Sequence, residues 1–393
     1  MKHIFFTFFL ISQIIYAQDN WTIQSQGLSN SLYDIHFANT ETGWSCGYDI
    51  LLKTENGGLD WNFLNPPDAS YSWNKIQFTD MNNGWLVGGN HTSDWIGKIY
   101  KTSNGGTTWN LNFSTNTARF EDAFFINSDE AIVIGIGDSP VGVVYKTVNG
   151  GATWEEKYTH DSILTTVEFY NESIGWIVGI DTVLYTDDGG ETWELQNAPS
   201  SAFITDIHIV DEQTVFVSDG LGDIYKTTSS GSSWTTINVS TSELNNLHFI
   251  DDNAITVGDW GEFFTSNDFG ATWEEGDFNT GHLYKIYFFN DLEAWIVGAD
   301  GTILHSETGI LKNTNEYEYE DIKIYPNPVQ THFKINSNIE LSAIQILNTE
   351  SKIVKHFTVI ETEKYDISDL SSGVYFVKLI SSQRVTYRKL IKH

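Results

Sequence analysis

Cysteine is almost absent from the 393 residues, and Cys46 is the single one. No intramolecular disulfide can form, and the ligands for a cysteine-based zinc site or an iron–sulfur cluster are missing. Basic residues are also scarce, with 21 Lys and Arg against 52 Asp and Glu and a net charge of -31. Because such a chain repels a phosphate backbone, we expect no nucleic-acid partner. Apolar residues reach 40% and aromatic residues 14%, far more than a disordered acidic chain contains, so the protein folds.

The one long apolar run lies at the amino terminus. Residues 1–17 read MKHIFFTFFLISQIIYA, with Lys2 before the apolar stretch and the small Ala17 at its end. This order is typical of a secretory signal peptide, and the stretch is short for a membrane span. No later segment approaches the length of a spanning helix. We therefore expect an exported mature chain that starts near Gln18 and has no transmembrane segment.

One eight-residue motif recurs six times without gaps. Each copy has Ser or Thr, then Asp, Asn or Ser two positions later, Gly two further on, and Trp three beyond that. The copies are TENGGLDW (54–61), TSNGGTTW (102–109), TVNGGATW (147–154), TDDGGETW (186–193), TTSSGSSW (227–234) and SNDFGATW (266–273). Gly supplies a backbone angle that other residues resist, and the hydroxyl and carboxamide side chains bond to nearby amides, so the motif predicts a hairpin turn.

The spacing of the motif predicts the architecture. Its Trp residues are 48, 45, 39, 41 and 39 positions apart, and a period near forty with short strands is typical of β-propeller blades. Trp21 lies 40 residues before Trp61 and adds a seventh repeat, whereas the last repeat, near Ser306, lacks its Trp strand. We therefore predict an all-β fold with a seven-bladed β-propeller, closed by residues 21–24 as the outermost strand of the last blade.

Charge is distributed unevenly between two parts of the chain. Residues 322–393 contain ten Lys and Arg against six Asp and Glu, whereas residues 18–321 contain ten against 46. This change indicates a domain boundary. We expect the propeller at 18–312, a polar linker at 313–321 and a second domain at 322–393. Short alternating runs in the second domain predict a small β-sandwich.

The second domain resembles a known family of export signals. YPNP (325–328), DLSSGVYFVKL (369–379) and KLIK (389–392) are similar, in the right order, to the C-terminal sorting domain of type IX secretion cargo. The resemblance implies that the type IX machinery is a partner through residues 322–393. It also implies passage through the periplasm to the outer-membrane surface or the medium.

The repeat resembles the Asp-box, or BNR, propellers. The strands GWLVG (84–88), GWIVG (175–179) and AWIVG (294–298) make it similar to the photosystem II assembly-factor type. The resemblance covers residues 21–310 and implies a fold more than a function, because Asp-box residues stabilise turns. Those assembly factors have an Arg-rich patch, and residues 18–321 contain one arginine, Arg119.

The residues give little support for an enzymatic function. Sialidases share the Asp-box and bind their carboxylate substrate with three arginines, so one arginine excludes a sialidase site. Other Asp-box propellers are glycoside hydrolases with paired carboxylates, and this alternative stays open because acidic residues are abundant. No signature of a nucleophile, phosphate loop or metal site occurs. We therefore predict no catalytic residues, metal or cofactor, and we expect His36, His208 and His248, which recur in the first strands, to serve packing.

The residues left unexplained by packing point to one face of the propeller. Trp73, Trp95 and Trp260 fall in neither the motif nor the GW strands, and we expect all three on the face formed by loops between second and third strands and loops entering first strands. An Asp occurs in each second-to-third loop: Asp49, Asp94, Asp138, Asp181, Asp219, Asp259 and Asp300. As ligand-binding residues we predict the three Trp together with Asp94, Asp138 and Asp259; the alternative is that each Trp ring is buried under its own loop. Aromatic rings on such a face suit stacking on a sugar or on apolar parts of a protein.

The function that follows is binding at the cell surface. We predict an exported, non-catalytic and monomeric propeller that binds a glycan or a protein. The alternative is a polysaccharide-degrading hydrolase.

Overall fold

The computed structural model describes residues 21–307 and 322–393, apart from gaps at residues 26, 91–94, 138–140, 200–202, 291, 338–340, 349–351, 358–363 and 382–384. The predicted signal peptide and linker lie outside the described residues. No helix among the described residues has the length and apolar character needed to cross a membrane.

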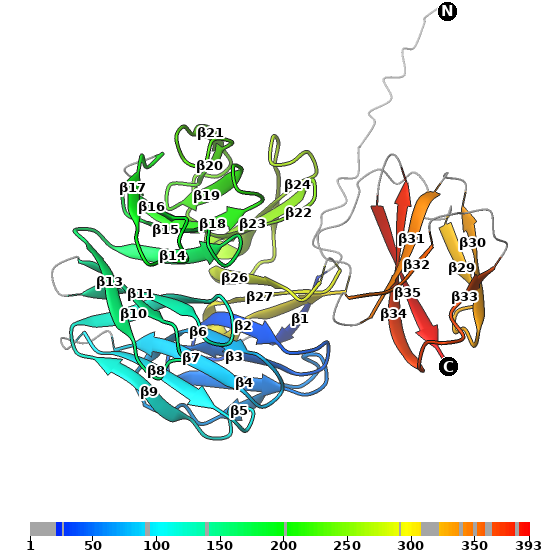
Figure 1. Ribbon diagram of the computed structural model, residues 1–393, viewed down its shortest axis with the longest axis horizontal. Helices are drawn as coiled ribbons and strands as arrows, with labels where there is room; N and C mark the ends of the chain where they lie inside the picture. Colours follow the sequence, from blue (N-terminus) through cyan, green and yellow to red (C-terminus); the bar gives the residue numbers. More distant parts are fainter. Residues whose placement is uncertain are drawn as a thin grey trace, which may run out of the picture.

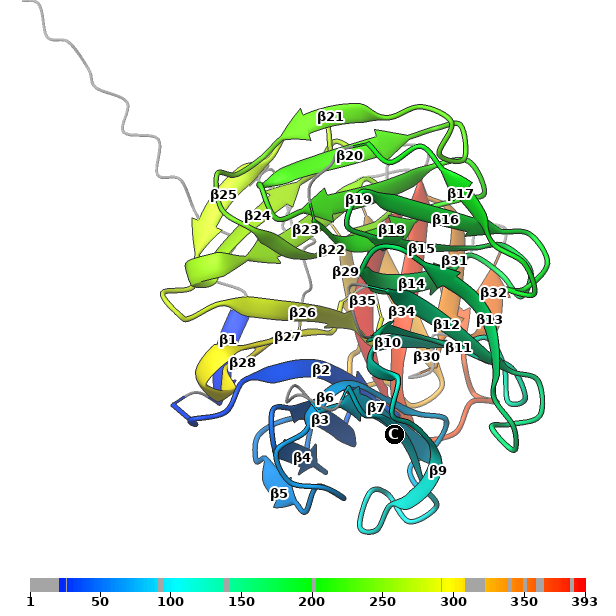
Figure 2. The ribbon, with the colours of Figure 1, turned by 90° about the vertical axis from the view of Figure 1, so that its left-hand side faces the viewer.

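Seven four-stranded antiparallel sheets follow one another around a ring (Figures 1 and 2). Blades 1 to 3 consist of β2 (Leu32–Phe37), β3 (Gly43–Gly47), β4 (Ile50–Thr54) and β5 (Asn62–Leu64); β6 (Ser72–Phe78), β7 (Gly84–Gly89), β8 (Gly97–Thr102) and β9 (Asn110–Thr115); and β10 (Ala118–Phe125), β11 (Ala131–Gly137), β12 (Gly142–Thr147) and β13 (Glu155–His160). Blades 4 to 6 consist of β14 (Leu164–Phe169), β15 (Gly175–Gly179), β16 (Thr182–Thr186) and β17 (Glu194–Gln196); β18 (Ile204–Ile209), β19 (Val215–Asp219), β20 (Asp223–Thr227) and β21 (Thr235–Asn238); and β22 (Leu244–Ile250), β23 (Asn253–Gly258), β24 (Glu262–Ser266) and β25 (Glu274–Asp277).

The seventh blade confirms the predicted closure of the ring. It consists of β26 (Leu283–Phe288), β27 (Ala294–Gly298) and β28 (Ile303–Ser306), with β1 (Trp21–Ser25) paired to the outer edge of β28. Trp21 lies opposite Ser306 in this antiparallel pair. The two ends of the propeller therefore share one sheet, and the ring has no open gap.

The gaps between neighbouring blades hold seven separate hydrophobic clusters. In three of them an aromatic ring of the second strand lies flat on an aromatic ring of the next blade's inner strand. The pairs are Trp44 with Phe78 (centroids 3.5 Å apart), Phe216 with Phe249 (4.1 Å) and Trp295 with Phe37 (3.7 Å). Four of the motif Trp residues, Trp61, Trp109, Trp193 and Trp273, stand edge-on against an inner-strand phenylalanine at the same gaps. The repeated aromatic positions therefore fill the wedges between blades.

Side chains of the inner strands also bond across every junction to the backbone of the next blade. In ring order these bonds run from Ile76 N–H to Asp34 Oδ2, Asn74 Nδ2 to the Phe120 carbonyl, Val167 N–H to Asp122 Oδ2, Thr166 Oγ1 to the Thr205 carbonyl, Leu247 N–H to Asp206 Oδ2, Ile286 N–H to Asn246 Oδ1 and the Tyr287 hydroxyl to the Phe37 carbonyl. Each is between 2.9 and 3.0 Å long. The ring is thus held by directional bonds as well as by burial.

The six motifs form the turns that their residues predict. In the first, the Thr54 hydroxyl accepts the Gly58 amide at 2.9 Å, and Asn56 Oδ1 accepts the Asp60 amide at 2.9 Å. Gly58 has φ 87°, a left-handed angle that favours glycine. The same hydroxyl-to-glycine bond recurs in the other five copies. The side chains that define the motif therefore serve the turn.

The remainder of the chain is a small β-sandwich, as predicted. One sheet contains β29 (Ile322–Tyr325), β30 (His332–Ser337) and β33 (Tyr365–Asp366), and the other contains β32 (Ile353–Phe357), β31 (Leu341–Leu347), β34 (Gly373–Ser381) and β35 (Val385–Lys392). Residues of both sheets, among them Phe333, Tyr365 and Val377, enclose one core.

Candidate binding site on the loop face

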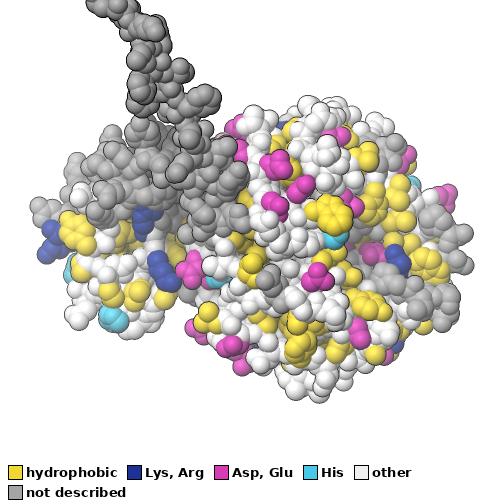
Figure 3. All heavy atoms as spheres, turned by 180° about the vertical axis from the view of Figure 1, so that it is seen from behind, with side chains coloured by type: hydrophobic (Ala, Val, Ile, Leu, Met, Phe, Trp, Pro, Cys, Tyr) yellow, Lys and Arg dark blue, Asp and Glu magenta, His cyan; other side chains and the backbone are white. Residues whose placement is uncertain are grey.

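The loop face of the propeller carries the loops between second and third strands and the loops that enter the inner strands. In five blades one backbone bond ties these two sets of loops together. It runs from Tyr48 N–H to the Ser31 carbonyl, Ile180 to Ile163, Gly220 to Phe203, Asp259 to Glu243, and Ala299 to His282, over 2.8 to 3.1 Å. Side chains at this edge are therefore held by a regular scaffold. Where Figure 3 shows the propeller, acidic side chains lie among apolar ones and basic side chains are few.

Trp260 is the outstanding residue of this face. It occupies the tip of η2 (Asp259–Gly261) between β23 and β24, with φ 61° and 66% of its surface exposed. The corresponding tips of blades 1, 4 and 7 place Asp49, Asp181 and Asp300 in the same left-handed conformation. Asp tolerates this conformation, whereas it strains a bulky side chain. Trp260 therefore carries both exposed apolar surface and backbone strain.

The Trp260 ring is supported by a polar cluster at the junction of blades 6 and 7. His282 lies 4.7 Å from it between ring centroids, at an interplanar angle of 44°. His282 Nδ1 lies 2.6 Å from Asp259 Oδ1, and Asn245 Nδ2 donates to the same oxygen at 3.3 Å and to the Leu283 carbonyl at 2.9 Å. These contacts fix the orientation of the His282 ring beneath Trp260.

Two tyrosines extend these rings across the next blades. The His282 and Tyr284 rings are nearly parallel, with centroids 6.3 Å apart, and Tyr284 meets Tyr33 of blade 1 edge-on at 5.5 Å. We call Trp260, His282, Tyr284 and Tyr33 the aromatic row. It crosses blades 6, 7 and 1 and offers partly exposed rings along the loop face.

Carboxylates flank the aromatic row and alter its electrostatics. Burial raises the pKa of Tyr284, and the charges of Asp259, Asp300 and Glu243 raise it further. The pKa of the Glu243 carboxyl is raised by partial burial and by the neighbouring Asp259 and Asp219. The row therefore lies in a negative field that favours neutral or cationic groups of a ligand.

Only some of the predicted ligand-binding residues lie together in the structure. Asp259 and Trp260 are adjacent in the cluster above. Trp73 is a correction, because its ring is fully buried (0% exposed) in β6, where it stacks on Tyr71 at 5.5 Å and belongs to the core between blades 1 and 2. Trp95 is half-buried in blade 2, with the Arg119 guanidinium 5.2 Å from its ring, and is not part of the aromatic row. Asp94 and Asp138 lie outside the described residues.

One of the seven loop aspartates, Asp219, serves its own turn. Asp219 is fully buried in its own turn, where its carboxylate accepts the amides of Leu221 and Asp223 and the hydroxyl of Tyr225. Its carboxylate is therefore used within the turn and is not exposed to a ligand. No group of three or more His, Cys, Asp or Glu suited to a metal ion occurs within the described parts of the chain.

Sequence reasoning missed His282, Tyr284, Tyr33 and Asn245. A signal was present, because Tyr33, Asn245 and Tyr284 each occupy the second position of an inner strand. Aligning the inner strands along with the motif would have brought these residues to one edge of the ring.

Fold and site together define an exported Asp-box-type propeller with a sorting domain. Residues 323–393 match the secretion system C-terminal sorting domain, and residues 112–242 match the photosynthesis system II assembly factor YCF48 family. The sorting domain directs the chain to the cell surface or outer membrane. No curated protein matches the chain.

Solved structures with low sequence identity share the fold. YCF48 bound to a D1 peptide has a TM-score of 0.62 at 19% identity, covering 74% of this chain and 97% of that one. YCF48 from Cyanidioschyzon merolae has a TM-score of 0.59 at 18% identity, covering 73% and 98%. PorZ, a surface component of the type IX secretion system of Porphyromonas gingivalis, has a TM-score of 0.54 at 12% identity, covering 93% of this chain and 59% of PorZ. At these identities the likeness concerns the fold alone.

Proposed function

We propose that the chain is a non-catalytic binding protein of the cell surface, which holds a glycan or a protein segment on the aromatic row. The observation that carries this proposal is Trp260, a largely exposed ring kept in a strained backbone conformation at the tip of a loop. Strain of this kind persists only when the surrounding structure holds it, and it clusters at ligand-binding sites. Solvated indole rings stack well on the apolar face of a sugar or on the side chains of a peptide.

Two further features support a binding role. The cluster of His282, Asp259 and Asn245 holds the aromatic row in place before any ligand arrives, which lowers the entropic cost of binding. A propeller of the same fold, YCF48, has been solved with a bound peptide. The proposal includes the division of the chain into a signal peptide (1–17), a propeller (18–312), a linker (313–321) and a sorting domain (322–393).

A glycan and surface-protein array probed with the full chain tests the proposal. We expect saturable binding to at least one class of ligand and at least a tenfold loss of affinity in Trp260→Ala. Phe63→Ala is the matched control, because Phe63 is an aromatic residue of equal exposure (67%) on the outer strand β5. Equal binding by Trp260→Ala and wild type would show that the ligand does not bind at the aromatic row. Release of reducing sugar from a polysaccharide would instead favour the hydrolase.

A further inference from the structure

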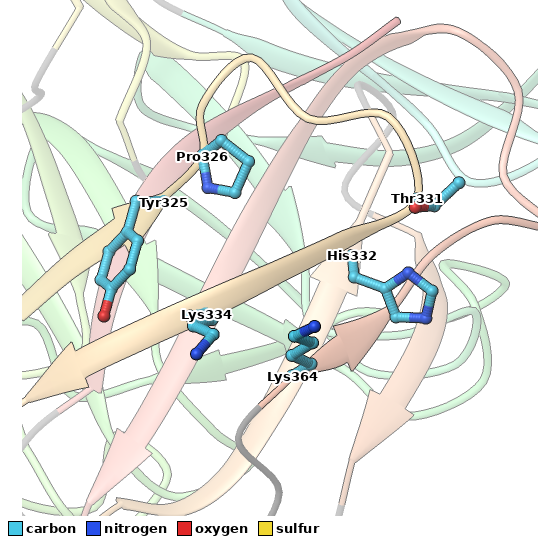
Figure 4. Close-up of a pocket in the computed structure, with 6 residues that line it drawn as sticks. All are labelled: Tyr325, Pro326, Thr331, His332, Lys334 and Lys364. Carbon is cyan, nitrogen blue, oxygen red and sulfur yellow. The ribbon is translucent and has the colours of Figure 1, made fainter.

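The sorting domain contains a basic pocket on the side of its smaller sheet that faces away from the core. The pocket has a volume of about 440 Å³ and is lined by Tyr325, Pro326, Thr331, His332, Lys334 and Lys364. Figure 4 shows Lys334 and Lys364 reaching into the same space beside β30, between Tyr325 and His332. None of these residues belongs to the propeller, so the pocket is independent of the aromatic row.

Strand pairing explains why these side chains meet. Tyr325 on β29 lies directly opposite Lys334 on β30, and side chains of directly opposed residues stand on the same face of a sheet. His332, two residues before Lys334, shares that face, whereas Phe333 between them is fully buried in the core. The sheet itself therefore sets the spacing of an aromatic ring, an ammonium group and an imidazole.

The wall formed by Tyr325 and Pro326 is fixed from behind. Asn327 Nδ2 donates to the Lys389 carbonyl at 2.8 Å, and Asn327 Oδ1 accepts the Ile391 amide at 2.9 Å. The Val329 amide then donates to the Ile391 carbonyl at 2.7 Å. The YPNP segment is thus anchored to β35, and none of these bonds uses a side chain of the pocket.

The pocket is basic in a chain whose net charge is -31. Five lysines elsewhere, Lys75, Lys98, Lys146, Lys157 and Lys355, each form an ion pair with a carboxylate. Within the described residues, Lys334 and Lys364 have no carboxylate at ion-pair distance, and His332 has one, Asp366, at 3.6 Å. Among the described residues, two lysines without an acidic partner lie beside an exposed tyrosine and form a site of positive potential with an apolar wall.

We propose that this pocket binds a phosphate monoester carried on a small polar ring or headgroup. Lys334 and Lys364 neutralise the phosphate, which carries nearly two negative charges at neutral pH. His332 and the Thr331 hydroxyl offer further hydrogen bonds to its oxygens. The Tyr325 ring and Pro326 pack against the carrier. The cavity exceeds the volume of a phosphate group, which leaves room for that carrier. A soluble sugar phosphate and a lipid headgroup share this chemistry.

Calorimetric titration of the full chain with three probes tests the proposal: inorganic phosphate, a hexose 6-phosphate, and vesicles of phosphatidic acid in phosphatidylcholine. We expect saturable binding of the hexose phosphate or of the phosphatidic acid vesicles, and whichever binds identifies the source. The double variant Lys334→Gln with Lys364→Gln should weaken that binding at least tenfold. Tyr325→Ala should weaken binding of the carrier-bearing probe and leave inorganic phosphate unchanged.

Lys355→Gln is the matched control, because it removes the same charge from the same domain at the ion pair with Asp369. Thermal unfolding of every variant verifies that the domain remains folded. The proposal is overturned if wild type binds none of the probes, if the double variant binds as tightly as wild type, or if Lys355→Gln loses as much affinity as the double variant.

Discussion

Trp260 gives the clearest conflict between stability and function at the scale of single residues. Its left-handed backbone conformation costs about 1 kcal/mol for a residue other than Gly, Asn or Asp. We expect Trp260→Asn to raise the free energy of unfolding by about this amount and to abolish ligand binding. Urea unfolding and the array ligand measure the two effects. Leu221→Asn is the control, because Leu221 lies exposed in the equivalent loop of blade 5 without a positive φ. A Trp260→Asn variant that is less stable than wild type would contradict the strain argument.

Glu168 is a half-buried acid of the inner strand β14 whose protonation is linked to stability. Removal from water and the charge of the nearby Asp206, against the opposing effects of Lys285 and Lys75, together raise its pKa to about 8. The unfolded value is 4.5, so between pH 4.5 and 8 the folded state retains a proton that the unfolded state has lost. Stability therefore falls as pH rises through this window. His36 and His208 act oppositely, because burial lowers their pKa to about 4 and stability rises with pH up to 6.5.

Glu168→Gln isolates the contribution of the acid. The histidine contribution is common to both proteins and cancels in the difference between variant and wild type. We expect the melting temperature of the variant, relative to wild type, to increase by several degrees between about pH 5 and about pH 8.5. Scanning fluorimetry over this range measures it. Glu194→Gln on the exposed strand β17 should leave the profile unchanged. A constant difference across the range would show that Glu168 is ionised in the folded state.

Individual site residues were predictable where the loop alone decides their position. Trp260 could be placed from the repeat because its loop is short and matches those of other blades. Trp73 was misplaced, because it lies in the inner strand β6 and not in the loop before it. The pairing of β6 with β7 shifts register between Trp73 and Lys75, and this bulge turns Trp73 to the side of Ile76 and Phe78 in the core. Every inner strand has a bulge at this place, as between Leu32 and Asp34, but a pattern of alternation read from sequence does not contain it.

Among the elements, the contribution of the Asp-box turn to stability can be predicted quantitatively. The Thr186 hydroxyl accepts the Gly190 amide at 2.9 Å and donates to Asp188 Oδ1 at 2.8 Å, and the residue is buried. Thr186→Val keeps the shape but leaves the amide and carboxylate without this partner. We expect a loss of about 1–3 kcal/mol in the free energy of unfolding, measured by urea titration. Thr236→Val on the exposed strand β21 should change it little. If the two substitutions change the free energy of unfolding equally, the bonds of the Thr186 hydroxyl do not stabilise the turn.

Strands and turns were predictable because each repeat supplies the same local signals, whereas the contacts between repeats were not. The bond from Asn246 Oδ1 to the Ile286 amide joins residues 40 positions apart. The equivalent position carries Asp206 in blade 5 and Lys75 in blade 2, so no single residue type marks it. His282 and Tyr284 were missed for the same reason: they become a site only when neighbouring blades bring Trp260 and Tyr33 beside them.

At the scale of the whole molecule, ring closure makes the two ends of the propeller depend on each other. Trp21 packs on Phe278 at 5.9 Å and is only 9% exposed, so β1 contributes a large core side chain as well as a paired edge. This contact joins residues more than 250 positions apart, and none of the other six inter-blade clusters draws on the amino-terminal strand. The last blade can therefore be completed only when the whole propeller has been synthesised and its amino terminus is free to pair.

Trp21→Ala tests whether this closure stabilises the entire ring. Removing a buried indole lowers the free energy of unfolding by about 3–5 kcal/mol. Because every blade packs against two neighbours, we expect a single unfolding transition at a lower temperature than in wild type. Hydrogen exchange should accelerate first in β28, which is paired to β1, and then in the other strands. Ile23→Ala is the matched control, because Ile23 lies on the same strand with 51% of its surface exposed, and it should change stability by less than about 0.5 kcal/mol. If Trp21→Ala unfolds no earlier than Ile23→Ala, or if exchange accelerates in the seventh blade alone, the closing strand stabilises only its own blade and not the ring.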